Sequence, residues 1–343
     1  MNASRQNPAT PPASPAGLVA ARAAAAGQAG AATPAPTAQI VQAARQAYLA
    51  ACMLDVSCLK PGNVSVRSPG HGMQAQDFIA SAQASVAPIG DAVLGVGARI
   101  LGAVEATRRA VGINTNLGIV LLAAPLLHAQ CHRRAGQGLR AALAASLAGL
   151  DRHDALLAYR AIRLAAPAGL GASTRHDVRD EPGVTLLQAM LESAARDSIA
   201  RQYASNYADV WDIGLPALRR ARTRFGREDA AVAAVYLGFL AAFADSHVLR
   251  KQGYGQAEQL RREGTACQAA MQRCADWDEV SGQLEAFDRR LKDRGINPGT
   301  SADLTVAVLL AERLEPTVCN DARPDAERAE GPGEVDRNDQ FVG

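Results

Sequence analysis

The sequence is poor in aromatic side chains, in lysine and in long apolar runs. Phe, Trp and Tyr make up 4% of its 343 residues, so a core must be built from Leu, Ala, Val and Ile. The β-branched and aromatic runs typical of strands are almost absent, whereas good helix formers fill most of the chain. The longest apolar run, Ile119 to Leu127, is well short of the roughly 20 residues that a membrane span needs. These absences predict a soluble, all-α protein.

An excess of charge of one sign is also lacking. The chain carries 36 Lys and Arg against 34 Asp and Glu, a formal net charge of +2, which argues against a nucleic-acid binder with a strongly basic face. The six cysteines form no CxxC pair and no dense framework, as expected of a reduced, cytoplasmic protein. We therefore expect small-molecule substrates, with no nucleic acid and no membrane as partners, and leave a homo-oligomer open.

Helical periodicity recurs through the middle of the chain, where no linker divides it. Residues 1–38 form an Ala/Pro-rich leader and residues 316–343 a polar tail, and we expect both to be disordered. The region 39–315 is then a single globular multi-helix bundle that carries the catalytic function. The helices expected within it are Gln39–Ser57, Ala75–Ala87, Asp91–Val111, Asn116–Arg134, Leu139–Leu150, Asp154–Ala165, Val184–Asn206, Asp209–Phe225, Glu228–Arg250, Gln256–Cys274, Asp276–Arg294 and Ser301–Leu314.

Polar, Gly-rich breaks between these helices are where we expect the chemistry, because a packed Ala/Leu helix offers little to a polar ligand. A further polar segment ends an apolar helix. The segments are "CLKPGNVSVRSPGHGM" at Cys58–Met73, "GINTN" at Gly112–Asn116, "GASTRHDVRDEPG" at Gly171–Gly183, "DSHVLRKQG" at Asp245–Gly253 and "RGINPGTSAD" at Arg294–Asp303.

The breaks contain features that suit a phosphate. Gly-Ile-Asn occurs twice, each time just before an aliphatic helix, and a helix N-terminus is a ready anion site. Simple capping by Asn and Ser is the alternative for each copy. Lysine occurs only at Lys60, Lys251 and Lys292, and the first two stand in breaks, where a compact ammonium can reach a phosphate.

Carboxylates stand in the same segments. Asp55, Asp245 and Asp303 are candidates to hold Mg²⁺, which binds through one or two carboxylates plus phosphate oxygens. Turn formation alone also favours Asp in loops. His128, Cys131 and His132 fall near one helical turn, but a third strong group of ligands is not nearby, so a polar helix end is the preferred interpretation.

Taken in order, these segments resemble the triphosphoribosyl-dephospho-CoA synthase family. The resemblance rests on "DVSCLKPGNVS", "GINTNLG", "DSHVLRKQG" and "NPGTSADLTVAVLL", and four ordered motifs at long separations are specific where Pro-Gly-Asn alone would mean little. It spans about Gln39 to Leu314. Two residues depart from the family pattern, since Leu59 and Gly72 replace its Pro and Asp. The sequence of the second motif resembles that of a divergent archaeal and methylotroph branch.

The resemblance implies a transferase that moves the triphosphoribosyl unit of ATP onto the 2′-hydroxyl of dephospho-CoA and releases adenine. It implies ATP as substrate and Mg²⁺ as cofactor, in the biosynthesis of a prosthetic group. The alternatives are transfer to another acceptor in methanopterin-type cofactor biosynthesis, a Mg²⁺-dependent ADP-ribosyl-type hydrolase, and a helical scaffold without catalysis.

Residue roles follow from the resemblance. The expected catalytic residues are Asp55, His71, Asp245 and Asp303, and the three aspartates among them are also the expected metal ligands. The expected substrate-binding residues are Lys60, Asn63, Asn114, Asn116, His247, Lys251, Asn297 and Ser301.

Overall fold

The computed structural model describes residues 36–167 and 177–315, and these residues are helical with no strand. The all-α prediction is confirmed. The expected leader lies outside the described residues except for 36–38, and the expected tail lies wholly outside them. The α-helices are α2 (Ala38–Ser57), α3 (Ala75–Ile89), α4 (Val96–Val111), α5 (Leu117–His132), α6 (Leu139–Ala148), α7 (Arg152–Ala165), α8 (Leu186–Ser193), α9 (Ser198–Ser205), α10 (Leu215–Phe225), α11 (Glu228–Ala242), α12 (Ser246–Gln252), α13 (Tyr254–Arg273), α14 (Trp277–Asp293) and α15 (Gly299–Leu314). A π-helical turn, η1 (Val210–Gly214), leads into α10.

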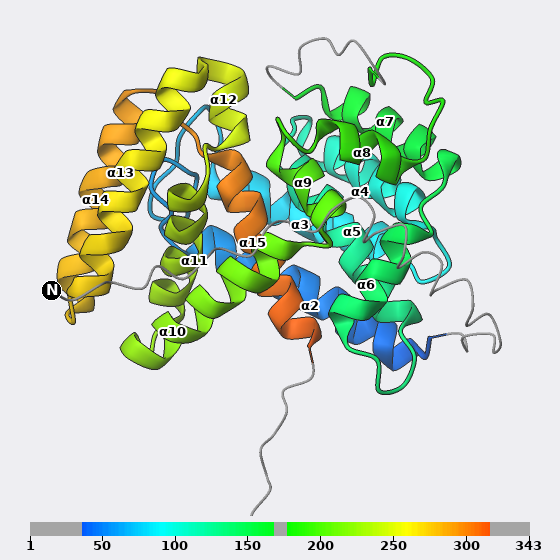
Figure 1. The fold of residues 1–343 in the computed structure, drawn as a ribbon, viewed down its shortest axis with the longest axis horizontal. Coiled ribbons are helices and arrows are strands. Elements are labelled where there is room, and N and C mark those ends of the chain that lie inside the picture. The colour runs from blue at the N-terminus through cyan, green and yellow to red at the C-terminus, as the bar shows by residue number, and fades with distance from the viewer. Residues whose placement is uncertain (1–35, 168–176, 316–343) are drawn as a thin grey trace, which may run out of the picture.

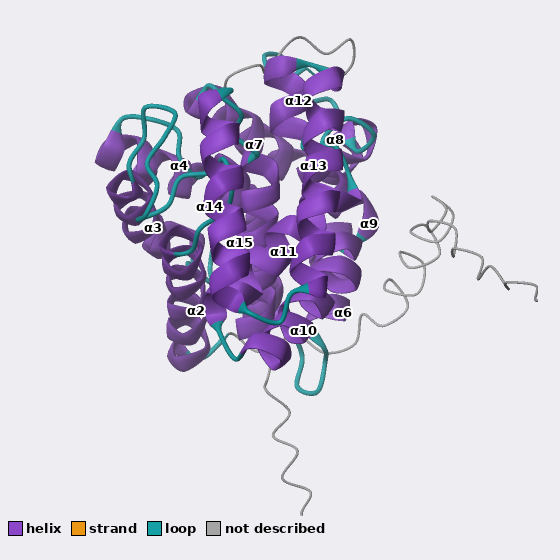
Figure 2. Ribbon diagram, turned by 90° about the vertical axis from the view of Figure 1, so that its left-hand side faces the viewer, coloured by secondary structure: helices purple, strands orange, loops and turns teal. Residues whose placement is uncertain are grey.

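Three helices form the centre of the molecule. Helices α5, α11 and α15 are buried along most of their length and on all sides. Helices α10 and α12–α14 lie on one side of this centre, and α3, α4 and α6–α8 lie on the other (Figure 1). Figure 2, turned by 90°, shows helices and loops alone in the described residues. Helix α2 packs against α15, α5 and α3, so the chain's first described helix is part of the core.

Two of the expected helices are wrong because each is really a pair. The range Val184–Asn206 divides into α8 and α9, since Asp197 Oδ1 accepts hydrogen bonds from the amides of Ile199 and Ala200 and so starts a new helix. The range Glu228–Arg250 divides at Phe243–Asp245, where Asp245 Oδ1 caps α12 in the same way. Apolar periodicity continues across both breaks, which is why it hides them.

Several expected boundaries are confirmed. Gly112 and Gly226 terminate α4 and α10 in the left-handed conformation, and Gly295 adopts it just after α14, as expected of glycine at a helix C-terminus. The expected start at Asp91 is five residues early, because α4 begins only at Val96.

No single helix in the described ranges is long and apolar enough to cross a membrane. Helices α11 and α12 taken together have the length and apolar composition of a membrane span, but the chain bends by 55° at the break between them.

Candidate active site

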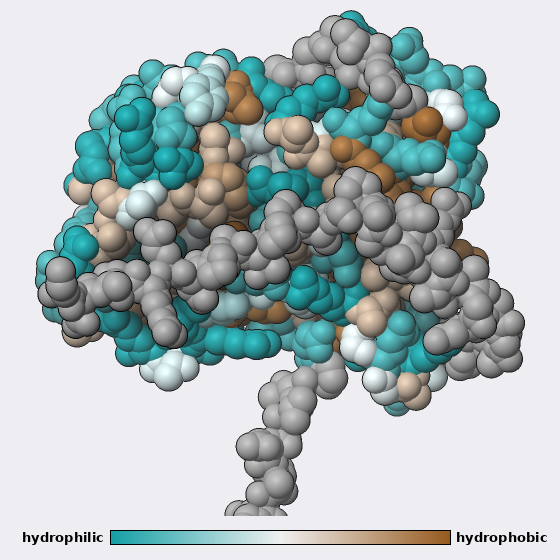
Figure 3. Space-filling model, in the orientation of Figure 1, coloured by the Kyte–Doolittle hydropathy of each residue, from teal (hydrophilic) through white to brown (hydrophobic). Residues whose placement is uncertain are grey.

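A cavity of about 750 Å³ opens between α12 and the α7–α9 region. Its polar wall is formed by the C-terminal part of α2, the loop after it, and the N-terminal parts of α5, α12 and α15. These are the places where the sequence has its Gly-rich segments. In the same view as Figure 1, the space-filling surface mixes polar and apolar residues across this upper part of the molecule (Figure 3).

The loop after α2 packs against the loop before α15. Gly62 has a φ of +82°, and a Cβ there would lie 2.8 Å from the carbonyl oxygen of Ile296, so both conformation and space require glycine. Asn63 Nδ2 donates to Asn297 Oδ1 over 2.9 Å, and Tyr236 donates its hydroxyl hydrogen to the carbonyl of Pro61. Two breaks more than 230 residues apart in the sequence therefore form one wall.

A buried ion pair lies behind this wall. Lys60 is fully buried and its Nζ lies 3.1 Å from Asp55 Oδ2. The ammonium also donates to the backbone carbonyls of Asp55 and Cys58. Burial raises the pKa of the Asp55 carboxyl, and the charge and hydrogen bond of Lys60 oppose this rise. The other oxygen, Asp55 Oδ1, has no hydrogen-bond partner in the described residues, and Asp55 lines the cavity.

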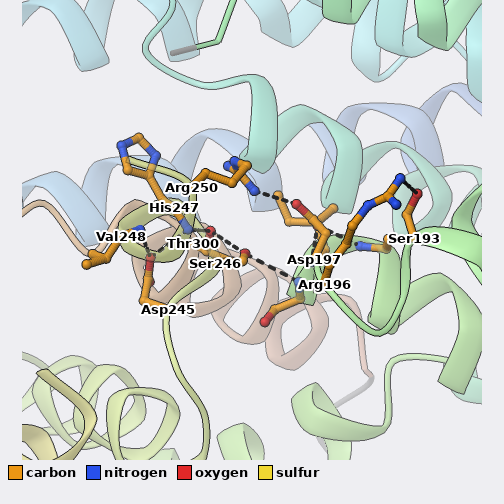
Figure 4. Close-up of polar contacts among 12 residues, drawn as sticks. Ser193, Arg196, Asp197, Asp245, Ser246, His247, Val248, Arg250 and Thr300 are labelled. Atoms are coloured by element: carbon orange, nitrogen blue, oxygen red, sulfur yellow. Dashed lines mark hydrogen bonds and ion pairs between the residues drawn. The ribbon is translucent and has the colours of Figure 1, made fainter. Parts of the chain in front are cut away.

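Asp245 joins α12 to α15. Its Oδ2 accepts hydrogen bonds from the amide and the hydroxyl of Ser301, both at 2.8 Å, while its Oδ1 caps α12. The hydroxyls of Ser246 and Thr300 lie 3.0 Å apart, and the amide of His247 donates to the Thr300 hydroxyl. Both oxygens of this buried carboxylate are therefore engaged with the protein itself. Figure 4 shows the contacts of Asp245 with the start of α12.

Asp303 of α15 packs against Gly118 in the first turn of α5. A Cβ on Gly118 would lie 2.0 Å from Asp303 Oδ2, so only glycine leaves room for this carboxyl group. Asp303 lines the cavity and is partly exposed into it. Desolvation by the surrounding protein, together with the nearby Asp245 and Asp55 charges, raises the pKa of Asp303 well above its usual range.

Two imidazoles line the same cavity. His71 has a φ of +56° and its Nε2 donates to the carbonyl of Gly62 over 2.8 Å. His247 lies over Gly299, and its Nε2 is buried without a hydrogen-bond partner among the described residues. Burial lowers the pKa of His247, so the ring is neutral near pH 7.

The expected site residues fall into two sets. A first set lines the cavity, namely Asp55, Asn63, His71, Asn114, His247, Lys251, Asn297 and Asp303. A second set lies behind the wall, namely Lys60, Asn116, Asp245 and Ser301. Asn114 combines both functions, because its Oδ1 also accepts a hydrogen bond from the amide of Leu117 at the start of α5. The predicted segments meet at one cavity, and the structure distinguishes the residues that line it from those buried behind its wall.

Other residues of the site have no motif to mark them. Arg250 donates to Asp197 Oδ2 over 2.5 Å, linking α12 to the start of α9 (Figure 4), and Arg108 and Arg196 also line the cavity. Asp197 follows a polar stretch and precedes Ser198, an N-cap signal that could have been found in the sequence. The sequence does not single out these arginines, because arginine is common throughout the chain.

The described residues contain no group of three or more His, Cys, Asp or Glu side chains that could hold a metal ion on their own. His128 and His132 instead stack at 4.2 Å between ring centroids, and His128 Nδ1 lies 3.0 Å from the hydroxyl of Ser146, which agrees with the polar helix end preferred from the sequence. Mg²⁺ bound through one or two carboxylates and a phosphate needs no such group. The unpartnered oxygen of Asp55 fits that mode, whereas the capped carboxylate of Asp245 does not.

Two comparisons with known proteins found a match. Residues 41–321 match the family model CitG, described as ATP:dephospho-CoA triphosphoribosyl transferase. A crystal structure titled putative triphosphoribosyl-dephospho-CoA synthase from Archaeoglobus fulgidus aligns with a TM-score of 0.51 and 24% identity, covering 69% of this chain and 97% of the other. No curated protein matches significantly. The structural match shows a shared fold, and the comparisons do not favour the hydrolase or the scaffold.

Proposed function

The chain belongs to the ATP:dephospho-CoA triphosphoribosyl transferase family, and we propose that the cavity lined by Asp55, His247 and Asp303 is where this transfer takes place. The observation that carries the proposal is the meeting of unsatisfied groups in one cavity. Asp55 Oδ1 and His247 Nε2 are buried without partners in the described residues, and the Asp303 carboxyl faces the same space. Buried polar atoms without partners are rare, and in a cavity they indicate a missing ligand.

The reaction exchanges two bonds at C1′ of the ATP ribose. The bond from C1′ to the adenine nitrogen breaks, and a bond from C1′ to the 2′-oxygen of dephospho-CoA forms. The acceptor hydroxyl loses a proton and adenine gains one. The transition state has oxocarbenium character, as in glycoside cleavage, so the site must supply a proton acceptor, a contact for the departing base and negative charge near C1′.

Three side chains suit these tasks. Asp303 lies on the cavity wall, and in its ionised form the raised pKa makes it a more basic carboxylate than an ordinary one. We assign it the hydroxyl proton. Lys60 favours the ionised form of Asp55, which supplies negative charge toward the ribose. The unpartnered Nε2 of His247 can hydrogen-bond the departing adenine. Lys251, Asn63 and Asn297, also on the cavity wall, are assigned to the phosphates and ribose.

The residues behind the wall act by positioning. Asp245 and Ser301 fix α12 against α15, and Lys60 fixes Asp55. Mg²⁺, where bound, would be held by Asp55 together with phosphate oxygens, and it would neutralise part of the triphosphate charge.

The test combines purified protein with ATP, Mg²⁺ and dephospho-CoA, following free adenine and the mass of the acceptor. Adenine together with a mass-shifted acceptor is the expected result. If adenine appears only with another acceptor, the transfer reaction would stand but dephospho-CoA would not be the acceptor. Release of ADP or AMP with no adenine would overturn the transfer itself.

Asp303→Asn should lower turnover by about 10³-fold or more, because an amide cannot accept the proton and general base catalysis is worth about 10²–10⁴-fold. Glu285→Gln on the exposed face of α14 is the matched control and should leave turnover unchanged. Retained turnover in Asp303→Asn would remove Asp303 from the reaction.

A cytoplasmic location belongs to the same proposal. It is supported by ATP as substrate and by the free thiols of the described cysteines, Cys52, Cys58, Cys131, Cys267 and Cys274. Cell fractionation with an antibody to the protein tests it.

A further inference from the structure

The cavity continues beyond the proposed reaction centre into a region of different chemistry. The side chains with which helices α7 and α8 line it are apolar apart from the phenol of Tyr159 and the hydroxyl of Ser193 at the end of α8. We call this region the apolar arm and define it by Tyr159, Ile162, Ala165, Leu186, Ala189 and Met190. All six are less than 10% exposed, and none belongs to a segment that the proposed reaction uses.

The apolar arm is a firm part of the fold. The amide of Leu186 donates to the carbonyl of Asp151 over 3.1 Å, and Arg152 Nε donates to the carbonyl of Pro182 over 2.7 Å. Both bonds tie the start of α8 to the start of α7. Helix α7 in turn packs closely on α4, where a Cβ on Gly97 would lie 2.6 Å from Asp154 Cα. The wall is therefore built before any ligand binds.

The arm and the reaction centre are built from different helices. Ile199 of α9 lies beside the reaction centre, since a Cβ on Gly118 would lie 2.0 Å from Asp303 Oδ2 and 2.9 Å from Ile199 Cδ1. Helix α8 contacts α9 and α7, whereas α12 contacts α13 and α15, and Figure 1 shows α12 apart from α7 and α8. Arg108 and Arg196 also line the cavity.

If the proposed function holds, the adenine, phosphate and pantetheine groups of the two substrates must occupy different parts of the cavity. The adenine of ATP is bonded to the reacting C1′, so it must stay beside Asp303 and His247. The triphosphate and the diphosphate are charged and need cations. The pantetheine chain of dephospho-CoA is uncharged, largely aliphatic, and separated from the reacting adenosine by a diphosphate.

We propose that the apolar arm binds the pantetheine chain of the acceptor and thereby selects dephospho-CoA over shorter nucleotides. Burial of the aliphatic chain against Ile162, Leu186 and Met190 supplies the binding free energy. The charge of Arg108 and Arg196 suits the diphosphate that joins the two halves of the acceptor. The arm is then a specificity element rather than part of the reacting centre.

The test uses ADP as the truncated acceptor, because ADP is dephospho-CoA without pantetheine. At saturating ATP, adenine release should show kcat/KM at least tenfold higher for dephospho-CoA than for ADP. Ala189→Phe fills the arm and should reduce this preference to less than threefold, by slowing the reaction with dephospho-CoA while leaving ADP and the KM for ATP unchanged. Leu191→Phe, on the same helix but 41% exposed, should keep the full preference.

A second variant and a binding measurement keep the proposal open to refutation. Met190→Ala removes contacts without adding volume, so it should lower the preference even where Ala189→Phe fails to fold. By calorimetry, wild type should bind dephospho-CoA at least tenfold more tightly than ADP, and Ala189→Phe should lose the difference. This difference in affinity is expected even if the protein releases no adenine. Absence of adenine would refute the proposed function, while the difference in affinity would still support the assignment of the apolar arm. Equal wild-type affinities, or a raised KM for ATP in Ala189→Phe, would overturn the arm's assignment.

Discussion

Asp55 and Lys60 form an ion pair in which the lysine is fully buried and the aspartate nearly so. Lys60 is fully buried, and its ammonium has only Asp55 and the carbonyls of Asp55 and Cys58 as partners in the described residues. A buried pair adds little net stability, but removing one member leaves the other charge uncompensated, at a cost of about 3–5 kcal/mol. The sequence suggests Lys60 as a phosphate contact, whereas in the structure its ammonium supports the Asp55 carboxylate.

Lys60→Met should destabilise the protein by about 3–5 kcal/mol in urea unfolding and lower turnover strongly, because Asp55 would protonate or move. The double variant Asp55→Asn/Lys60→Met should recover part of the stability and none of the turnover. Recovery stays partial because the carbonyls of Asp55 and Cys58 still lose their donor. An equal loss of stability in the single and double variants would contradict the supporting role.

Gly118 is the second residue whose importance comes from a neighbour. Gly118→Ala would place a methyl group 2.0 Å from Asp303 Oδ2, and we expect a loss of turnover of about 10²-fold, since small displacements of a reacting group carry costs of this size. Gly282→Ala is the control, because a Cβ there meets nothing within 4 Å on an exposed face of α14. The control should gain slightly in stability. Full activity in Gly118→Ala would show that Asp303 can move without consequence.

Among the elements, α14 holds the loop of residues 58–73 in place. Asp288 Oδ1 accepts a hydrogen bond from the amide of Gly62 over 2.8 Å, and its Oδ2 accepts one from the Ser68 hydroxyl. Lys292 lies 3.2 Å from Asp288 Oδ2 and donates to the carbonyl of Ser68. Neither residue lines the cavity, so these two side chains act on the site through the loop.

Asp288→Asn should lower kcat by about tenfold and raise the exchange rate of the amides of residues 60–70, because the loop loses a charged anchor. Asp293→Asn, an exposed position at the end of the same helix, should change neither. A fall in kcat without faster amide exchange would argue that Asp288 acts by another route.

The elements also show what the sequence can and cannot predict. Period and composition predict α2, α5 and α15 closely, because each buries an apolar face over many turns. They fail at α8–α9 and α11–α12, where a single Asp cap interrupts an unbroken apolar pattern. The motifs likewise predict which segments meet. They cannot predict that Asp245 faces the protein while Asp303 faces the cavity, since that depends on a partner, Ser301, contributed by another helix.

At the scale of the whole molecule, the cavity separates two groups of helices that few polar contacts join across it. Arg250 of α12 pairs with Asp197 at the start of α9, and the amide of Ser198 donates to the Ser246 hydroxyl over 3.3 Å. The arginine and aspartate side chains of this pair are 26% and 24% exposed, so the pair contributes about 1 kcal/mol rather than the larger value of a dry pair. Its main effect is to hold α12, a helix of only seven residues, against the other side.

Arg250→Met should therefore cost about 1 kcal/mol in overall stability but raise the exchange rate of the α12 amides by a clearly larger factor than those of α11 and α15. Arg219→Met, an exposed arginine on α10, is the matched control and should alter neither. ATP and the acceptor would contact the cavity walls on both sides. Adding both should therefore slow amide exchange in α12 again in Arg250→Met, because a ligand that binds only the state with α12 folded and in place stabilises that state by mass action. Slower exchange at α12 without any change at α8 would mean that the ligands contact one side only, and would contradict a site that spans the two groups of helices.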